Sequence, residues 1–179
     1  SVRRHRLSFE VSGETLALFR EAQVRVRRDV GGSVDDDLLL QQIARTILGG
    51  PTDAGRASYQ IAVTVCPRCE RGQIDGGGEP VTVDPVLVEQ AECDGQKTHV
   101  GHRATQAVTP ATRREVMRRD HGKCRVPGCR SAAWVDVHHI VPRGCGGEHD
   151  AGNLVVVCGA HHAAAHRGTL ILEGTAAAL

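Results

Sequence analysis

The chain has 179 residues with 22 basic and 21 acidic side chains, so its formal net charge is only +1 and excludes a strongly polyanionic or polycationic protein. Only 2% of the residues are aromatic, which excludes a large aromatic core and favours a thin aliphatic core stabilised by bound metal. No signal-peptide core and no apolar stretch of about 18 residues occurs, so we expect a cytoplasmic protein without a membrane partner, in which cysteines at knuckle spacing bind metal.

The first segment, residues 1–50, has the pattern of a strand followed by two helices. The strand is indicated by apolar residues that alternate with polar ones: Leu7, Phe9 and Val11. Helical periodicities follow over about residues 14–29 and 38–48, separated by the helix-breaking pair Gly31–Gly32. This order resembles the ribbon–helix–helix family, which implies a homodimer with paired strands in the major groove of DNA. A helical dimerisation or packing element is the simpler alternative.

The middle segment, residues 51–105, contains a smaller metal signal. A predicted strand over residues 59–65 ends at a Cys-x2-Cys knuckle. The residues that could form a structural zinc site here are Cys66, Cys69, Cys93 and either His99 or His102. The alternative is a Cys-x2-Cys turn that binds no metal.

The third segment, residues 106–179, begins with a basic helix. Thr109 is suited to its N-cap and Pro110 to its first turn, and Gly122 ends the run. The helix contains four arginines: Arg113, Arg114, Arg118 and Arg119. Residues 100–179 hold ten basic and six acidic side chains, so the positive charge lies in this part of the chain. We expect the arginines to contact DNA phosphates, the alternative being a solvated helix face.

After this helix the sequence contains more nitrogen and sulfur ligands than one metal ion can use. Four of them match the ligand set of a tetrahedral structural zinc: Cys124, Cys129, Cys158 and His161. The remaining polar residues form a second set: His138, His139, Asn153, His162 and His166. A structural metal beside a catalytic metal is the economical interpretation, and it indicates an enzyme that acts on phosphodiesters.

Helical geometry separates the two sets of ligands. The apolar run 154–157 predicts a buried strand, and residues 160–167 predict a short helix that stops at Gly168. Two pairs of side chains share a face of this helix: Cys158 with His161, and His162 with His166. One residue advances a helix by about 100°, so each pair can serve a different metal ion.

The ordered combination of these motifs resembles the HNH endonucleases, whose fold is the ββα-metal motif. The resemblance is densest from Arg113 to Arg167 and leaves the first hundred residues unexplained. The matching pieces are RDHGKC ending at Cys124, VPGC ending at Cys129, VHHI through Ile140, GGEHD through Asp150, NL at 153–154 and CGAHH through His162.

The resemblance implies a role for each matching residue. His139 would be the general base that takes a proton from the attacking water, and Asn153 would brace the loop that orients this base. Three histidines would hold the catalytic metal, Mg²⁺ or another divalent ion: His138, His162 and His166. The resemblance further implies that this metal neutralises the scissile phosphate and stabilises the leaving 3′ oxygen. The expected catalytic residues are therefore His139, Asn153, His138 and His162.

The sequence thus predicts an α+β protein in three parts. A β-α-α N-terminal region and a small zinc-knuckle middle segment precede a C-terminal ββα-metal domain with one structural zinc. The predicted function is metal-dependent hydrolysis of DNA phosphodiester bonds. A non-catalytic, zinc-stapled DNA-binding module is the main alternative, and an RNA-directed or toxin-type nuclease is the third.

Overall fold

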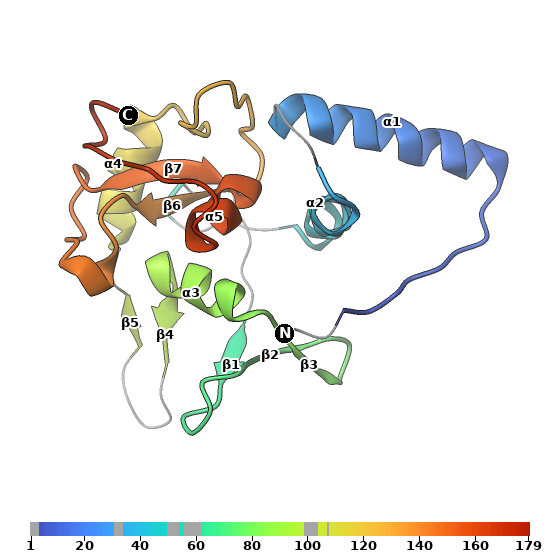
Figure 1. Ribbon diagram of the computed structural model, residues 1–179, viewed down its shortest axis with the longest axis horizontal. Helices are drawn as coiled ribbons and strands as arrows, with labels where there is room; N and C mark the ends of the chain where they lie inside the picture. The colour runs from blue at the N-terminus through green and yellow to red at the C-terminus, as the bar shows by residue number, and fades with distance from the viewer. Residues whose placement is uncertain (1–3, 31–33, 50–53, 56–61, 99–103, 107) are drawn as a thin grey trace.

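The computed structural model describes residues 4–30, 34–49, 54–55, 62–98, 104–106 and 108–179. Within these ranges the fold is α+β, as the sequence predicts (Figure 1). The α-helices are α1 (Gly13–Val30), α2 (Asp36–Leu48), α3 (Pro85–Asp94), α4 (Pro110–Arg119) and α5 (Gly159–His166), with a short 3-10 helix at Arg143–Cys145. The strands are β1 (Val63–Val65), β2 (Gly72–Asp75), β3 (Pro80–Thr82), β4 (Gln96–Lys97), β5 (Thr105–Gln106), β6 (Val135–His139) and β7 (Leu154–Cys158).

Within the described part of the chain all strand pairs are antiparallel, and they form three small sheets, β1–β2–β3, β4–β5 and β6–β7. In none of the described segments is there a helix with both the length and the apolar content needed to cross a membrane.

The β6–β7 hairpin is the centre of the core. Its register runs from Val135 opposite Cys158 to His139 opposite Leu154, and every residue of β7 is buried. The helices α3, α4 and α5 pack around the hairpin (Figure 1). The buried apolar residues of the described chain are aliphatic side chains or cysteines, in agreement with the thin aliphatic core expected from composition.

Helix α4 begins where its sequence signals predict and ends at Arg119, before the predicted stop at Gly122. The Thr109 hydroxyl accepts a hydrogen bond from the Thr112 amide, and Pro110 occupies the first turn. The helix is tied to β7 by Asp120, which is 3% exposed. Its Oδ2 accepts the Val156 amide proton at 2.9 Å and pairs with the Arg119 guanidinium at 2.7 Å.

Two of the four arginines predicted to contact DNA make contacts within the fold. Arg113 is 2% exposed, and its Nη2 lies 3.0 Å from Asp136 Oδ1 on β6. Arg119 donates to the carbonyl oxygens of Ala151 and Leu154 in addition to its ion pair. The burial of Arg113 contradicts its predicted contact with DNA, whereas Arg119 is 30% exposed and Arg114 and Arg118 are exposed.

The N-terminal segment differs from its predicted pattern in one element. The two helices form where expected, as α1 and α2, but residues 4–12 form no strand. Leu7 and Phe9 are 65% and 73% exposed. A strand needs a neighbouring edge for its backbone hydrogen bonds, and no described segment of this single chain supplies one. The ribbon–helix–helix dimer therefore stays a prediction.

The middle segment contains a helix that the sequence interpretation missed. Strand β1 forms within the predicted run 59–65, whose first three residues lie outside the described ranges. Helix α3 follows β3, and its signals are ordinary: the Asp84 carboxylate accepts the Val86 amide proton at 2.9 Å, and Pro85 occupies the first turn. Its packing against β2 is close, because a Cβ at Gly72 would lie 2.5 Å from Val88 Cγ2.

Replacing Asp120 with alanine should destabilise the hairpin core. The buried Val156 amide would lose its acceptor, which costs about 1–3 kcal/mol of unfolding free energy. Urea unfolding at a fixed zinc concentration, followed by the fluorescence of Trp134, the single tryptophan, measures the loss. Glu115→Ala on the exposed side of α4 is the control, and its change should stay within about 0.5 kcal/mol. Equal effects of both substitutions would contradict this role for Asp120.

Candidate metal centres

The first candidate centre consists of the four residues predicted to bind structural zinc, Cys124, Cys129, Cys158 and His161, whose ligand atoms all lie within 4.8 Å of one another. His161 Nδ1 is 3.4 Å from Cys124 Sγ and 3.3 Å from Cys158 Sγ. The sulfurs of Cys129 and Cys158 are 4.0 Å apart. Tetrahedral zinc with bonds of about 2.0–2.3 Å has ligand atoms about 3.3–3.8 Å apart, so this cluster could hold a metal ion such as zinc.

Local backbone structure sets the positions of these ligands. The Cys124 amide donates to Ser131 O at 2.9 Å, and the Cys129 amide donates to Val126 O at 3.0 Å, which closes the loop into a knuckle. Gly128 in this loop has a φ of +82°, a conformation that glycine adopts without strain. Cys158 ends β7 and is also the N-cap of α5, so His161 follows it by one helical turn.

The three thiols of this centre differ in how readily they ionise. A hydrogen bond from Cys158 lowers the pKa of Cys124 to about 5, and the same interaction raises the pKa of Cys158. Burial raises the pKa of Cys129. The lowered pKa of Cys124 favours the thiolate, the form that binds metal, whereas a metal ion would have to displace protons from the other two sulfurs.

The second candidate centre consists of Cys93, His138, His162 and His166, with ligand atoms again within 4.8 Å of one another. Cys93 Sγ lies 3.1 Å from His166 Nε2 and 3.8 Å from His138 Nδ1. The His162 ring centroid is 5.1 Å from that of His138 and 5.0 Å from that of His166. His162 Nε2 is buried and has no hydrogen-bond partner, as expected for an atom that binds a metal ion.

Two carboxylates lie behind the histidines of this centre. Glu89 Oε2 is 3.6 Å from His166 Nδ1, and Asp136 Oδ2 is 3.9 Å from His162 Nδ1. The ion pair with Arg113 holds Asp136 in position. Both carboxylates lie at the ring nitrogen opposite the one that could bind metal, where their charge increases the basicity of the imidazole.

Burial keeps the histidines of the second centre neutral. The pKa of His138 is lowered to about 3 and that of His162 to about 4, mainly by desolvation, and the pKa of His166 is lowered for the same reason. Neutral imidazole is the form that ligates metal, so at pH 7 these residues could bind an ion without first releasing protons.

The alternation of side chains along β6 directs His139 away from His138. His139 is 1% exposed, and its Nε2 lies 2.8 Å from Nδ1 of the half-buried His149. Desolvation lowers the pKa of His139 to about 4, so its imidazole is neutral at pH 7. The residue is therefore paired with another histidine instead of joining the metal cluster.

Asn153 holds together the loop that contains His149. Its side-chain amide donates to the carbonyl oxygens of Val141 at 3.1 Å and Glu148 at 2.9 Å, and its Oδ1 accepts the Val141 amide proton at 2.8 Å. Both ends of the loop are thus attached to the start of β7. The Asn153 amide, together with the Asp150 carboxylate that accepts the Gly152 and Asn153 amide protons, holds the loop that places His149 against His139.

One predicted grouping is wrong. Cys93 was expected to bind zinc with Cys66, Cys69 and a histidine, but it lies in the second centre with three histidines. Its position on α3, packed against β6 and α5, brings it there. Cys66 and Cys69 lie in the β1–β2 turn and belong to neither cluster found among the described residues, and His99 and its alternative, His102, lie outside those residues.

Sequence reasoning also missed several residues around the second centre. Glu89, Asp136 and the pairing of His149 with His139 have no local motif. One signal was available. Asp84 and Pro85 indicate the start of a helix, and on that helix the i, i+4 spacing places Glu89 and Cys93 on the same face.

Comparison with known proteins found no matching family model, no curated protein of significant similarity and no solved structure of significant similarity.

Metal analysis should find about two zinc ions per chain, one for each four-ligand cluster. Cys129→Ser should remove one ion and destabilise the fold, because metal-binding energy contributes directly to folding in a small core. Elemental analysis after gel filtration, together with thermal unfolding, measures both effects. Cys145→Ser is the matched control, since Cys145 is exposed and belongs to neither cluster. A folded, metal-free chain would contradict this assignment.

Proposed function

We propose that this chain is a divalent-metal-dependent endonuclease of the HNH type that hydrolyses DNA phosphodiester bonds. The observation that supports it most is the pair of adjacent histidines on β6. His138 faces the cluster formed with α5, whereas His139 faces a separate histidine on the following loop. The order β6–β7–α5 is also the order of elements in a ββα-metal motif, and Cys124, Cys129, Cys158 and His161 would hold the structural zinc next to it.

In this proposal the chain's own residues activate and direct the water. His139, neutral at pH 7, takes a proton from the attacking water as general base. Before substrate binds, the hydrogen-bonded loop of Asn153 holds His149 against that imidazole. A divalent ion bound by His138, His162 and His166 would neutralise charge on the phosphate and stabilise the leaving 3′ oxygen.

Water can reach His139 only if a neighbouring side chain moves. Its Nδ1 is buried without a partner and its Nε2 is occupied by His149. Because His149 is half-buried on an exposed loop, a shift of this residue is the shortest way for water to reach Nε2. His149 would then leave the base and face the phosphate.

The alternative function, a DNA-binding module without catalysis, is favoured by one observation. Each centre brings together four protein ligands, which is the number that fills a tetrahedral shell in structural zinc sites. Catalytic zinc sites keep one position open for water or substrate.

Plasmid nicking distinguishes the two functions. With added Mg²⁺, Mn²⁺, Zn²⁺ or Co²⁺, each tested separately, the parent chain should nick supercoiled DNA with at least one ion, and chelator should abolish the reaction. His139→Ala should lower the rate by about 10²–10⁴-fold, the usual contribution of a general base, while metal content and fold stay unchanged.

The control is His121→Asn, since His121 is exposed, belongs to neither cluster and has a φ of +56° that asparagine tolerates. Equal nicking by the parent and His139→Ala would remove His139 from the mechanism. Binding of DNA without nicking by either protein would favour the binding module.

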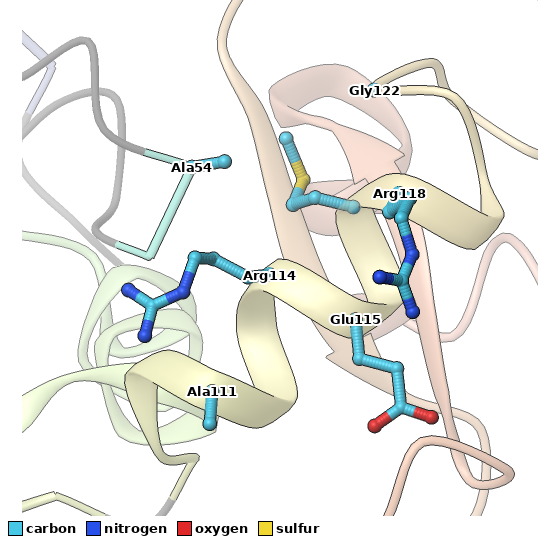
Figure 2. Close-up of a pocket in the computed structure, with 7 residues that line it drawn as sticks. Ala54, Ala111, Arg114, Glu115, Arg118 and Gly122 are labelled. Carbon is cyan, nitrogen blue, oxygen red and sulfur yellow. The ribbon is translucent and has the colours of Figure 1, made fainter.

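The exposed side of α4 is the surface that we propose for binding DNA phosphates. Arg114 and Arg118 line a shallow pocket there together with Glu115 (Figure 2). In this view the two guanidinium groups extend to different sides, and the carboxylate of Glu115 lies below Arg118. Each arginine would therefore reach its own phosphate, and Glu115 would reduce the local positive charge.

Removing both exposed arginines should weaken DNA binding for all sequences alike. In Arg114→Ala/Arg118→Ala the slope of log affinity against log salt should fall by about 0.9 for each phosphate that the variant no longer neutralises. Fluorescence anisotropy over a salt series measures this slope. Arg20→Ala/Arg27→Ala, which removes the same charge from exposed positions of α1, should leave the slope unchanged. An unchanged slope in the α4 variant would indicate a solvated helix face.

A further inference from the structure

We infer that Cys93 is the fourth ligand of the second centre, and that this centre is a closed site for a thiophilic transition-metal ion such as Zn²⁺, capped by α3. The inference goes beyond the proposed nuclease, because one thiolate and three imidazoles can hold such an ion whether or not the chain cuts DNA. It also changes the expected metal, since the site proposed from sequence contained only histidines.

The interatomic distances fit one ion bound by all four residues. The Cys93 sulfur lies 3.1 Å and 3.8 Å from the nearest nitrogens of His166 and His138. These separations bracket the edge of a zinc tetrahedron with one Zn–S and three Zn–N bonds, about 3.3–3.6 Å. Cys93 is 7% exposed and His162 is 3% exposed, so water has little access to the space between the ligands.

Helix α3 holds Cys93 in this position from several directions. The N-terminus of α3 is capped by Asp84, and its Val88 packs against Gly72 on β2. One turn before Cys93, Glu89 faces His166. One residue before it, the Glu92 carbonyl accepts a hydrogen bond from Arg143 Nη1 at 3.1 Å. The sulfur is thus positioned by a helix that is anchored to the middle sheet, to α5 and to the loop after β6.

The chemistry of the ligand set selects the ion. Mg²⁺ prefers six oxygen ligands and keeps much of its water, and this cluster offers no oxygen. Thiolate and imidazole suit Zn²⁺ and Co²⁺. Four protein ligands also leave no coordination position open, so a phosphate oxygen could bind the ion only by displacing the Cys93 sulfur. Helix α3 would therefore act as a cap over the metal.

Cobalt substitution tests the inference without any measurement of DNA cleavage. The metal-free full chain is titrated with Co²⁺, and the thiolate-to-cobalt charge-transfer absorption is recorded for the parent, Cys93→Ser and Cys145→Ser. The two centres together contain four thiolate ligands, so loss of Cys93 should remove about a quarter of this absorption. It should also lower the affinity for one of the two Co²⁺ ions at least tenfold. Cys145→Ser should match the parent. An unchanged spectrum in Cys93→Ser would overturn the inference.

X-ray absorption of the zinc-loaded parent covers the case in which Cys93→Ser does not fold. Four thiolates distributed over two zinc ions give an average of about two sulfur ligands per ion, whereas three give about 1.5. The lower average would overturn the inference. These readouts are separate from the nuclease proposal, since a chain that never nicks DNA can contain the site and an active nuclease can lack it.

Discussion

The direct junction between β7 and α5 is the constraint on which the rest of the C-terminal structure depends. Cys158 is both the last residue of β7 and the N-cap of α5, so no loop separates the buried strand from the helix. This fixes the rotation of α5 about its axis. His161 consequently faces the cysteine knuckle, and His162 faces His138 on β6. Two clusters can lie side by side because adjacent residues on a helix point about 100° apart.

A second feature of the C-terminal core is the number of polar ligands that it buries. The strand interior consists of buried valines and a leucine, and the core formed by the described residues contains no large aromatic side chain. Around this interior lie three deeply buried histidines: His138, His139 and His162. Their buried imidazoles stay neutral, which avoids the cost of enclosing charge. The remaining nitrogen atoms need either a hydrogen-bond partner or a metal ion, and the geometry of the clusters suits the metal.

What the sequence could predict here was set by the range of the interactions involved. The start of α4, the strand β7 and the spacings within the pairs Cys124–Cys129 and Cys158–His161 depend on neighbours within a few residues, and their signals could be read directly. The inward orientation of Arg113 depends on Asp136, 23 residues away. The place of Cys93 in the second centre depends on its contact with His138, 45 residues away. The predicted strand at residues 7–11 depends on a pairing edge, and periodicity alone does not supply one. Local patterns therefore identified the ligands better than their partners.

The contact between Cys93 and His166 joins points that are 73 residues apart in sequence. A bound ion at this contact would close a long loop and connect α3 to α5, much as a disulfide connects distant segments. Unlike a disulfide, such a link exists only while the ion is bound. Its contribution to stability grows with the logarithm of the free metal concentration. The fraction of molecules in which the middle segment is attached to the C-terminal core would then depend on the free zinc concentration.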